Sequence, residues 1–166
     1  MKNNHATARE IFAEIQSRPF CVPVHLGDPS HNCYIKGLEL LQRLGALGYT
    51  VRGRIGETVW PKGVVPAEII SLWPQSETVT HFYVEVLIDD KWKILDPTIQ
   101  PSMASTGFPI GSWDNNTVCF PITKLYTQEE NIAYHAEWEN QQLQRRYFNS
   151  AHDFLVAFNG WLARYA

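Results

Sequence analysis

The sequence predicts an α+β domain, and three patterns carry that prediction. Apolar residues recur at helical spacing in 6–17, again from Cys33 onward, and once more toward the C-terminus. Between these segments, 78–96 is rich in β-branched and aromatic residues around a two-residue turn, which is typical of an antiparallel hairpin. Helices combined with an antiparallel sheet define the α+β class.

The composition argues against several classes of function. The chain carries 14 basic and 17 acidic residues, so it lacks the positive field that holds nucleic acid or anionic lipid. The N-terminal segment has no apolar run of a signal peptide, and no stretch reaches the roughly 20 apolar residues of a membrane span. We therefore expect a cytoplasmic protein with neither a nucleic-acid nor a membrane partner.

Chain length and cysteine content favour one domain that needs neither a disulfide bond nor a metal ion in order to fold. The single domain should cover 1–166, with a core at about 30–100 and a helical extension at about 123–166. Three cysteines at irregular spacing suit neither a disulfide framework nor a Cys-x-x-Cys zinc pair. At least one thiol is therefore free, and we expect no metal.

The first half of the chain should contain two helices. Apolar spacing predicts the first over 6–17, and Pro19 ends it. The segment 21–32 mixes Pro, Gly, Asp, Ser and Asn, which indicates a loop. A second helix should begin at Cys33, and Gly48 suits the position just after its end. This second helix is expected to be central and largely buried.

The strands should form an antiparallel sheet on which the second helix packs. Their common features are β-branched and aromatic residues bounded by turn residues, and they are predicted at 49–60, 78–88 and 91–96. The segment 61–77 is expected to be an insertion with a short helix from Pro66. The segment 97–121 is irregular, and its length indicates a covering or substrate-contacting loop.

A pair of helices should close the chain. Thr127 and Glu130 form a capping-box pattern that predicts a helix to about Tyr147. A last helix is expected to begin at Ser150 and to run through Leu162.

The predicted hairpin brings a histidine and a carboxylate together. If Ile88 pairs with Lys91, the register places His81 opposite Thr98. Side chains alternate along a strand, so Asp96 shares the face of His81, with diagonal Cβ atoms about 7 Å apart. A hydrogen bond between the two would orient the imidazole and leave its second nitrogen for another group.

Cys33 is the candidate for that other group. A thiolate is the nucleophilic form of cysteine, and a helix N-terminus or a neighbouring imidazolium favours it. Cys33 lies at a predicted helix start, whereas Cys21 and Cys119 lack matching partners and are expected to be core residues. The predicted catalytic set is therefore Cys33, His81 and Asp96.

Two segments resemble the transglutaminase-like superfamily. HNCYIKGLELLQRLGALGYTVRGRIG is similar to its cysteine-bearing helix and the strand that follows, and THFYVEVLIDDKWKILDPT is similar to its histidine strand, hairpin and Asp-Pro-Thr ending. The resemblance covers about 30–100 and implies a small, bacterial-type, single-domain member with a papain-like core. It assigns Cys33 as nucleophile, His81 as general acid/base and Asp96 as orienting carboxylate, with no cofactor.

We expect thiol-dependent hydrolysis of an amide or ester in a peptide, a protein or a small molecule, through a thioester. One alternative is transfer of the acyl group to an amine, as in a transglutaminase. Another is a non-catalytic peptide-binding or protein-binding module on the same scaffold. A third is a metal-dependent hydrolase that uses His25, His31 and His81.

Other residues are candidates for the oxyanion site or for contact with the substrate. The backbone N–H of Cys33 is a natural donor to the oxyanion of an acyl-transfer intermediate. The candidates for a second donor or for substrate contact are Asn32, Gln16, His31, Tyr83 and Trp60.

Overall fold

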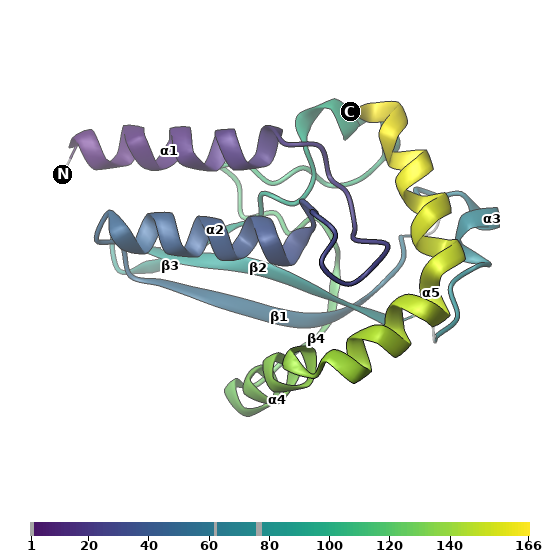
Figure 1. The fold of residues 1–166 in the computed structure, drawn as a ribbon. Coiled ribbons are helices and arrows are strands. Elements are labelled where there is room, and N and C mark those ends of the chain that lie inside the picture. The colour runs from purple at the N-terminus through teal and green to yellow at the C-terminus, as the bar shows by residue number, and fades with distance from the viewer. Residues whose placement is uncertain (1, 62, 76–77) are drawn as a thin grey trace.

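The computed structural model describes residues 2–61, 63–75 and 78–166, and it shows an α+β fold (Figure 1). Within those residues the elements are α1 (Lys2–Ser17), α2 (Cys33–Ala46), β1 (Val51–Val59), α3 (Ala67–Ile70), β2 (Thr78–Ile88), β3 (Lys91–Leu95), the 3-10 helix η1 (Pro101–Thr106), β4 (Ile122–Leu125), α4 (Gln128–Glu139), α5 (Gln141–Leu162) and the 3-10 helix η2 (Ala163–Tyr165). The strands form one antiparallel sheet in the order β3-β2-β1-β4. The predicted α+β class is confirmed.

The hairpin of β2 and β3 has the predicted register. Ile88 pairs with Lys91, and the ladder continues until β3 ends at Leu95. Asp89 and Asp90 have φ values of 49° and 59°, the left-handed conformation that a two-residue hairpin turn requires. The chain therefore leaves the ladder at the residue that precedes the predicted site carboxylate.

Two helices cover the sheet in successive layers. α2 lies on β1 and β2, and α1 lies on α2 (Figure 1). Alternate residues of β2 face this helical side, as the period of a strand dictates. The buried apolar side chains between the layers include Ala8, Phe12, Ile15, Leu40, Leu44, Ile55, Phe82, Val84, Val86 and Leu95. This core fixes α2, and therefore Cys33 at its first turn, on the sheet.

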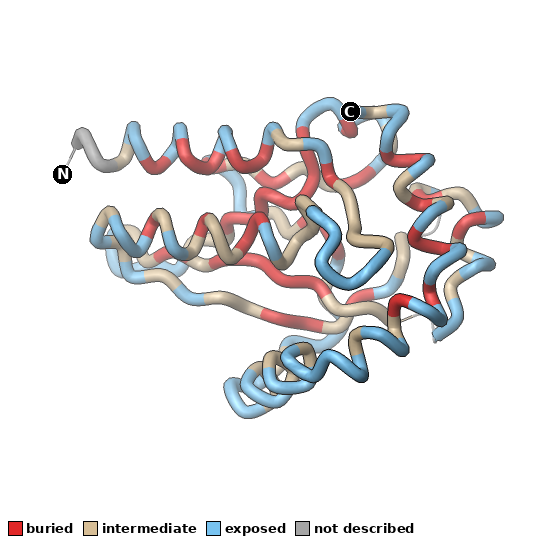
Figure 2. Tube along the Cα trace, viewed as in Figure 1, coloured by how far each residue is buried: buried red, intermediate tan, exposed pale blue. Residues whose placement is uncertain are grey.

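A second apolar core surrounds α5. It joins one face of this helix to the irregular segment 97–121, and most of its members are aromatic or aliphatic. They include Ile99, Met103, Phe108, Cys119, Phe120, Phe154, Leu155, Phe158, Trp161 and Leu162. The tube in Figure 2 shows buried residues on the inner side of α5. The segment 97–121 thus contributes to the core, although it contains little regular structure beyond η1.

The two C-terminal helices divide at a different residue from the one predicted. The predicted helix start at Ser150 is wrong, because α5 runs without a break from Gln141 to Leu162. Asn140 separates α4 from α5 with an extended backbone (φ −78°, ψ 102°). Its side chain accepts hydrogen bonds from two backbone N–H groups of the next turn, which makes it the N-cap of α5.

Other boundaries differ by smaller amounts. The capping box is confirmed, because Thr127 Oγ1 accepts from the Glu130 N–H and the Glu130 carboxylate accepts from the Thr127 N–H. β4 escaped prediction because it has only four residues, most of them exposed. The short helix α3 starts one residue after Pro66. Residues 62 and 76–77 of the predicted insertion lie outside the described residues.

We predict opposite effects for two Gly→Ala changes in α2. A Cβ at Gly37 would overlap the Phe82 ring, whereas a Cβ at Gly45 would make an ordinary contact 3.8 Å from Val51. Overpacking should make Gly37→Ala destabilising by about 1–3 kcal/mol. Gly45→Ala should stabilise the fold by up to about 1 kcal/mol, since alanine favours helix over glycine.

Urea unfolding measures both changes. The Gly37→Ala loss should shrink when Phe82 is also replaced by leucine, because the smaller side chain leaves room for the added methyl group. Equal effects of the two alanines would contradict this packing of α2 on β2.

Candidate active site

Cys33 begins α2, and the residue before it caps the helix. The Asn32 side-chain oxygen accepts a hydrogen bond from the Ile35 backbone N–H at 3.0 Å. The backbone N–H groups of the first helical turn have no partner within the helix, and the helix dipole places partial positive charge there. The half-buried Cys33 side chain therefore lies where negative charge is favoured.

His81 and Asp96 form a buried pair. Nε2 of His81 and Oδ2 of Asp96 are 2.7 Å apart, and the two side chains are 2% and 0% exposed. The predicted partnership of these residues is therefore present in the structure, although β3 ends before it reaches Asp96. Because Nε2 faces the carboxylate, Nδ1 is the ring nitrogen left for another partner.

The Asp96 carboxylate is held on both oxygens. Oδ1 accepts from the Thr98 hydroxyl at 2.6 Å and from the Thr98 backbone N–H at 3.1 Å. Oδ2 accepts from the Cys119 backbone N–H at 2.7 Å as well as facing His81. A buried carboxylate needs such donors, because leaving its lone pairs unsatisfied costs several kcal/mol.

The electrostatics favour an imidazolium–carboxylate pair. Burial lowers the pKa of His81, but the charge and hydrogen bond of Asp96, with a smaller contribution from Cys33, outweigh it and raise the pKa to about 10. Burial raises the pKa of Asp96, but the His81 charge and the hydrogen bonds to the carboxylate lower it overall. The imidazole is thus protonated at neutral pH and hydrogen-bonds Asp96.

Aromatic residues from four segments belong to the environment of the pair and the thiol. The Phe120 ring centroid lies 4.8 Å from that of His81, and Tyr83 stacks on His81 at 6.3 Å. Burial raises the pKa of both Tyr134 and Tyr147, and a negative charge on Cys33 raises each further. These two tyrosines belong to α4 and α5, so the C-terminal helices come close to the thiol.

Two hydrogen bonds attach α4 beside the site. The Tyr134 hydroxyl bonds the Thr80 hydroxyl at 2.8 Å, one residue before His81 in β2. The Tyr34 hydroxyl bonds Nδ1 of His135 at 3.0 Å, one residue after Cys33 in α2. Sequence reasoning missed this contribution, because nothing in the local sequence of α4 signals which distant element it meets.

The remaining predicted residues have other recorded contacts. The Gln16 amide donates to the Gly111 carbonyl at 2.6 Å, and the His31 backbone N–H donates to the Cys21 carbonyl at 3.2 Å. Trp60 packs against aromatic rings of α5 in the second core. Asn32 acts as the cap of α2, and Tyr83 lies beside His81. Their roles as oxyanion donors or substrate contacts stay predictions.

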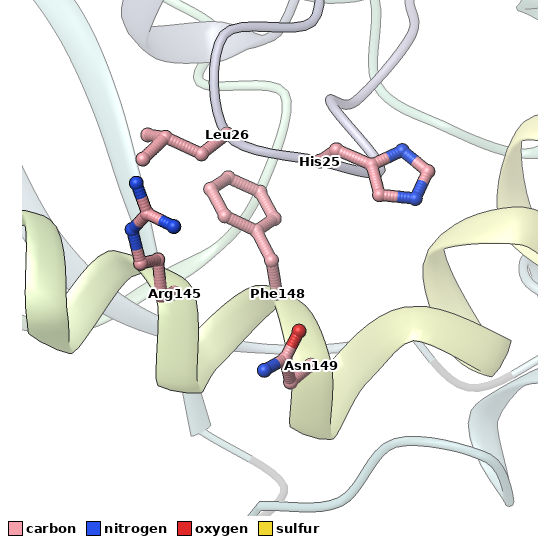
Figure 3. Close-up of a pocket in the computed structure, with 5 residues that line it drawn as sticks. All are labelled: His25, Leu26, Arg145, Phe148 and Asn149. Carbon is pink, nitrogen blue, oxygen red and sulfur yellow. The ribbon is translucent and has the colours of Figure 1, made fainter.

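A shallow hollow lies between the loop that leads to Cys33 and α5 (Figure 3). Its volume is about 270 Å³, and its lining residues are His25, Leu26, Arg145, Phe148 and Asn149. The lining includes none of the three predicted catalytic residues, so the hollow is a separate feature of the surface.

Two further observations concern metals and membranes. No group of three or more histidine, cysteine or acidic side chains in the described residues has the arrangement of a metal site. None of the helices in the described part of the chain combines the length and apolar character that crossing a bilayer requires.

Comparison of the chain with protein-family models, with curated proteins and with solved structures finds no match.

The buried pair predicts a pH-dependent stability. The pKa of His81 rises from 6.5 to about 10 on folding, so its stabilising contribution is complete below about pH 6.5 and is lost as pH rises toward 10. The free energy of unfolding of the protein that retains His81, relative to His81→Gln, should therefore fall from pH 7 to 10 by up to about 1.4 kcal/mol per pH unit.

Urea unfolding of the two proteins at several pH values measures this difference. Both proteins carry Cys33→Ala, so that ionisation of the thiol, which depends on His81, makes no contribution. Other groups that titrate in the same range, such as Lys36 with a pKa lowered by burial to about 8, are common to both proteins and largely cancel. A difference that stays constant between pH 7 and 10 would show that native His81 is not protonated.

Proposed function

We propose that Cys33 takes an acyl group from an amide or ester and forms a thioester that water then hydrolyses. The observation that carries this proposal is the buried His81–Asp96 hydrogen bond, together with a thiol at the start of α2 that contributes to the raised pKa of His81. A nucleophilic thiol, a base and an orienting carboxylate brought together are the signature of covalent acyl transfer.

The same residues support a transglutaminase-like assignment with a papain-like core. A cysteine at the first turn of a helix, a histidine on a strand and an aspartate just after the next strand occur in that order along the chain. The helix packs on the antiparallel sheet that carries the histidine. The assignment is our proposal, and it rests on this order and packing together with the sequence resemblance.

The first step of the proposed reaction is acylation of Cys33. The Cys33 sulfur, as thiolate beside the His81 imidazolium, attacks the carbonyl carbon and forms a tetrahedral intermediate. The backbone N–H of Cys33 belongs to the first helical turn, whose donors have no partner within the helix, and in this mechanism it stabilises the oxyanion. The Nδ1 proton of His81 passes to the leaving amine or alcohol as the C–N or C–O bond breaks, which leaves a thioester and a neutral imidazole.

Deacylation reverses the proton transfers. Neutral His81 takes a proton from water, the hydroxide attacks the thioester, and the acid leaves as the sulfur–carbon bond breaks and the thiolate is restored. Asp96 holds the imidazole in one orientation through both steps. An amine in place of water would give acyl transfer instead of hydrolysis. The reducing cytoplasm suits such an enzyme, because its thiol stays free there.

We predict that alkylation of Cys33 depends on His81. Replacing His81 by alanine removes the imidazolium that favours the thiolate, so the rate of iodoacetamide modification at Cys33 should fall at least about tenfold at neutral pH. Intact-mass spectrometry followed by peptide mapping gives the rate at each cysteine.

Cys21 supplies an internal control, because it is half-buried like Cys33 and interacts with the backbone of His31 rather than with His81. Its rate should be the same in both proteins, which also shows that the variant is folded. Equal rates at Cys33 in the two proteins would overturn the role given to His81.

A further inference from the structure

Lys36 is a buried charge that the proposed chemistry leaves unexplained. Its side chain is 0% exposed and is among the largest of the fully buried side chains in the described residues. Lysine is almost never fully buried unless it is paired. Within the described residues, no carboxylate lies within ion-pair distance of Lys36. Such a costly arrangement in the first turn of the cysteine-bearing helix calls for a physical reason.

The ammonium group of Lys36 is instead held by three backbone carbonyls. Nζ donates to the carbonyl oxygens of Gln16 at 3.2 Å, Arg18 at 2.6 Å and Thr98 at 3.0 Å. An ammonium has three protons, so the three carbonyls match its donor capacity. Burial lowers the pKa of Lys36 to about 8, while the charges of Cys119, Cys21 and Asp96 oppose that shift and Arg18 adds to it. The group is charged at neutral pH.

These three contacts join segments that are distant in sequence. The Gln16 and Arg18 carbonyls belong to the end of α1 and the residue after it. The Thr98 carbonyl belongs to the segment that follows β3. Lys36 lies three residues after Cys33, which is one turn along the same side of α2. We call these three contacts of Lys36 the clamp. The clamp holds the first turn of α2, which carries Cys33, against the end of α1 and against the segment after β3.

The contact with Thr98 leads directly back to the catalytic set. Thr98 donates two hydrogen bonds to Asp96, and Asp96 hydrogen-bonds His81. Cys33 contributes electrostatically to the raised pKa of His81. Because Cys33 and Lys36 share one helical turn, the contacts form a closed circuit that begins and ends on α2. A shift of α2 relative to Asp96 must break at least one contact of this circuit.

We propose that Lys36 is a positioning residue, which sets the placement of the His81–Asp96 pair relative to the Cys33 sulfur through Thr98. The inference rests on the proposed function of Cys33, since positioning matters only if the thiol reacts. It differs from a purely structural role, in which loss of Lys36 would lower stability without changing the site of the folded molecule.

The test compares Lys36→Met with Leu44→Ala. Methionine keeps most of the apolar stem and removes all three donors. Leu44 is equally buried and lies two turns further along α2, so its truncation lowers stability at a distance from the clamp. Both variants are studied at a temperature at which each remains folded by circular dichroism.

Two readouts report on the site rather than on stability. The low-field NMR resonance of the His81 Nε2 proton reports its hydrogen bond to Asp96, and iodoacetamide reports the reactivity of Cys33. In Lys36→Met the resonance should broaden or shift, and the alkylation rate at Cys33 should fall about tenfold. In Leu44→Ala both should match the wild type. Wild-type values in Lys36→Met, or the same loss in both variants, would overturn the proposal.

A double-mutant cycle tests the route through Thr98. Thr98→Val removes the hydroxyl that donates to Asp96 but keeps the backbone carbonyl that Lys36 contacts. If Lys36 acts through Thr98, the losses in alkylation rate should combine to less than the product of the single losses. Losses that multiply independently would contradict a shared route.

Lys36→Arg covers the case in which Lys36→Met does not fold. Arginine keeps the positive charge, but its longer, planar group must displace the Thr98 carbonyl, so the His81 resonance should still shift. An unchanged resonance in a folded Lys36→Arg protein would overturn the proposal. Failure of the proposed function has a separate signature, since wild-type Cys33 would then react no faster than Cys33 in His81→Ala.

Discussion

The buried carboxylate of Asp96 is the constraint on which the site depends. It has no exposed surface, so its negative charge must be satisfied entirely by the protein. The donors come from three places, namely His81 in β2, Thr98 just after β3, and the Cys119 backbone N–H at the end of the irregular segment. The backbone of Asp96 is enclosed as tightly, because a Cβ at Gly111 would overlap its carbonyl oxygen. The groups that satisfy this one charge therefore bring together β2, the chain just after β3, and the end of segment 97–121.

The rest of the fold supplies what the pair needs in order to act on a thiol. The core between α1, α2 and the sheet brings the start of α2 to His81, and the core around α5 places Phe120 on the imidazole. Lys36 joins the two regions through backbone carbonyls that belong to different segments. Hydrogen bonds from Tyr134 and His135 then attach α4 to the strand of His81 and to the helix of Cys33. Scaffold packing and site geometry are thus achieved by the same contacts.

Sequence reasoning predicted the parts of this arrangement that depend on local rules. The hairpin register follows from a two-residue turn and the alternation of a strand, and it was enough to bring His81 near Asp96. The helix start at Cys33 follows from the apolar spacing that begins there, and the structure adds Asn32 as its cap. Contacts between distant segments were beyond such rules. The Cys119 N–H on Asp96, the carbonyls around Lys36 and the approach of Tyr134 depend on tertiary packing, and the break at Asn140 depends on a cap inside an otherwise helical pattern.

The central claim is that Cys33 carries an acyl group during turnover, and trapping that intermediate tests it most directly. The protein is mixed with a panel of activated esters, quenched in acid within seconds, and examined by intact-mass spectrometry with peptide mapping. The account predicts one added acyl group per chain, located on Cys33 and absent from Cys33→Ala. An acyl group found on Cys21 or Cys119, or no adduct from any ester while the protein is folded, would contradict it.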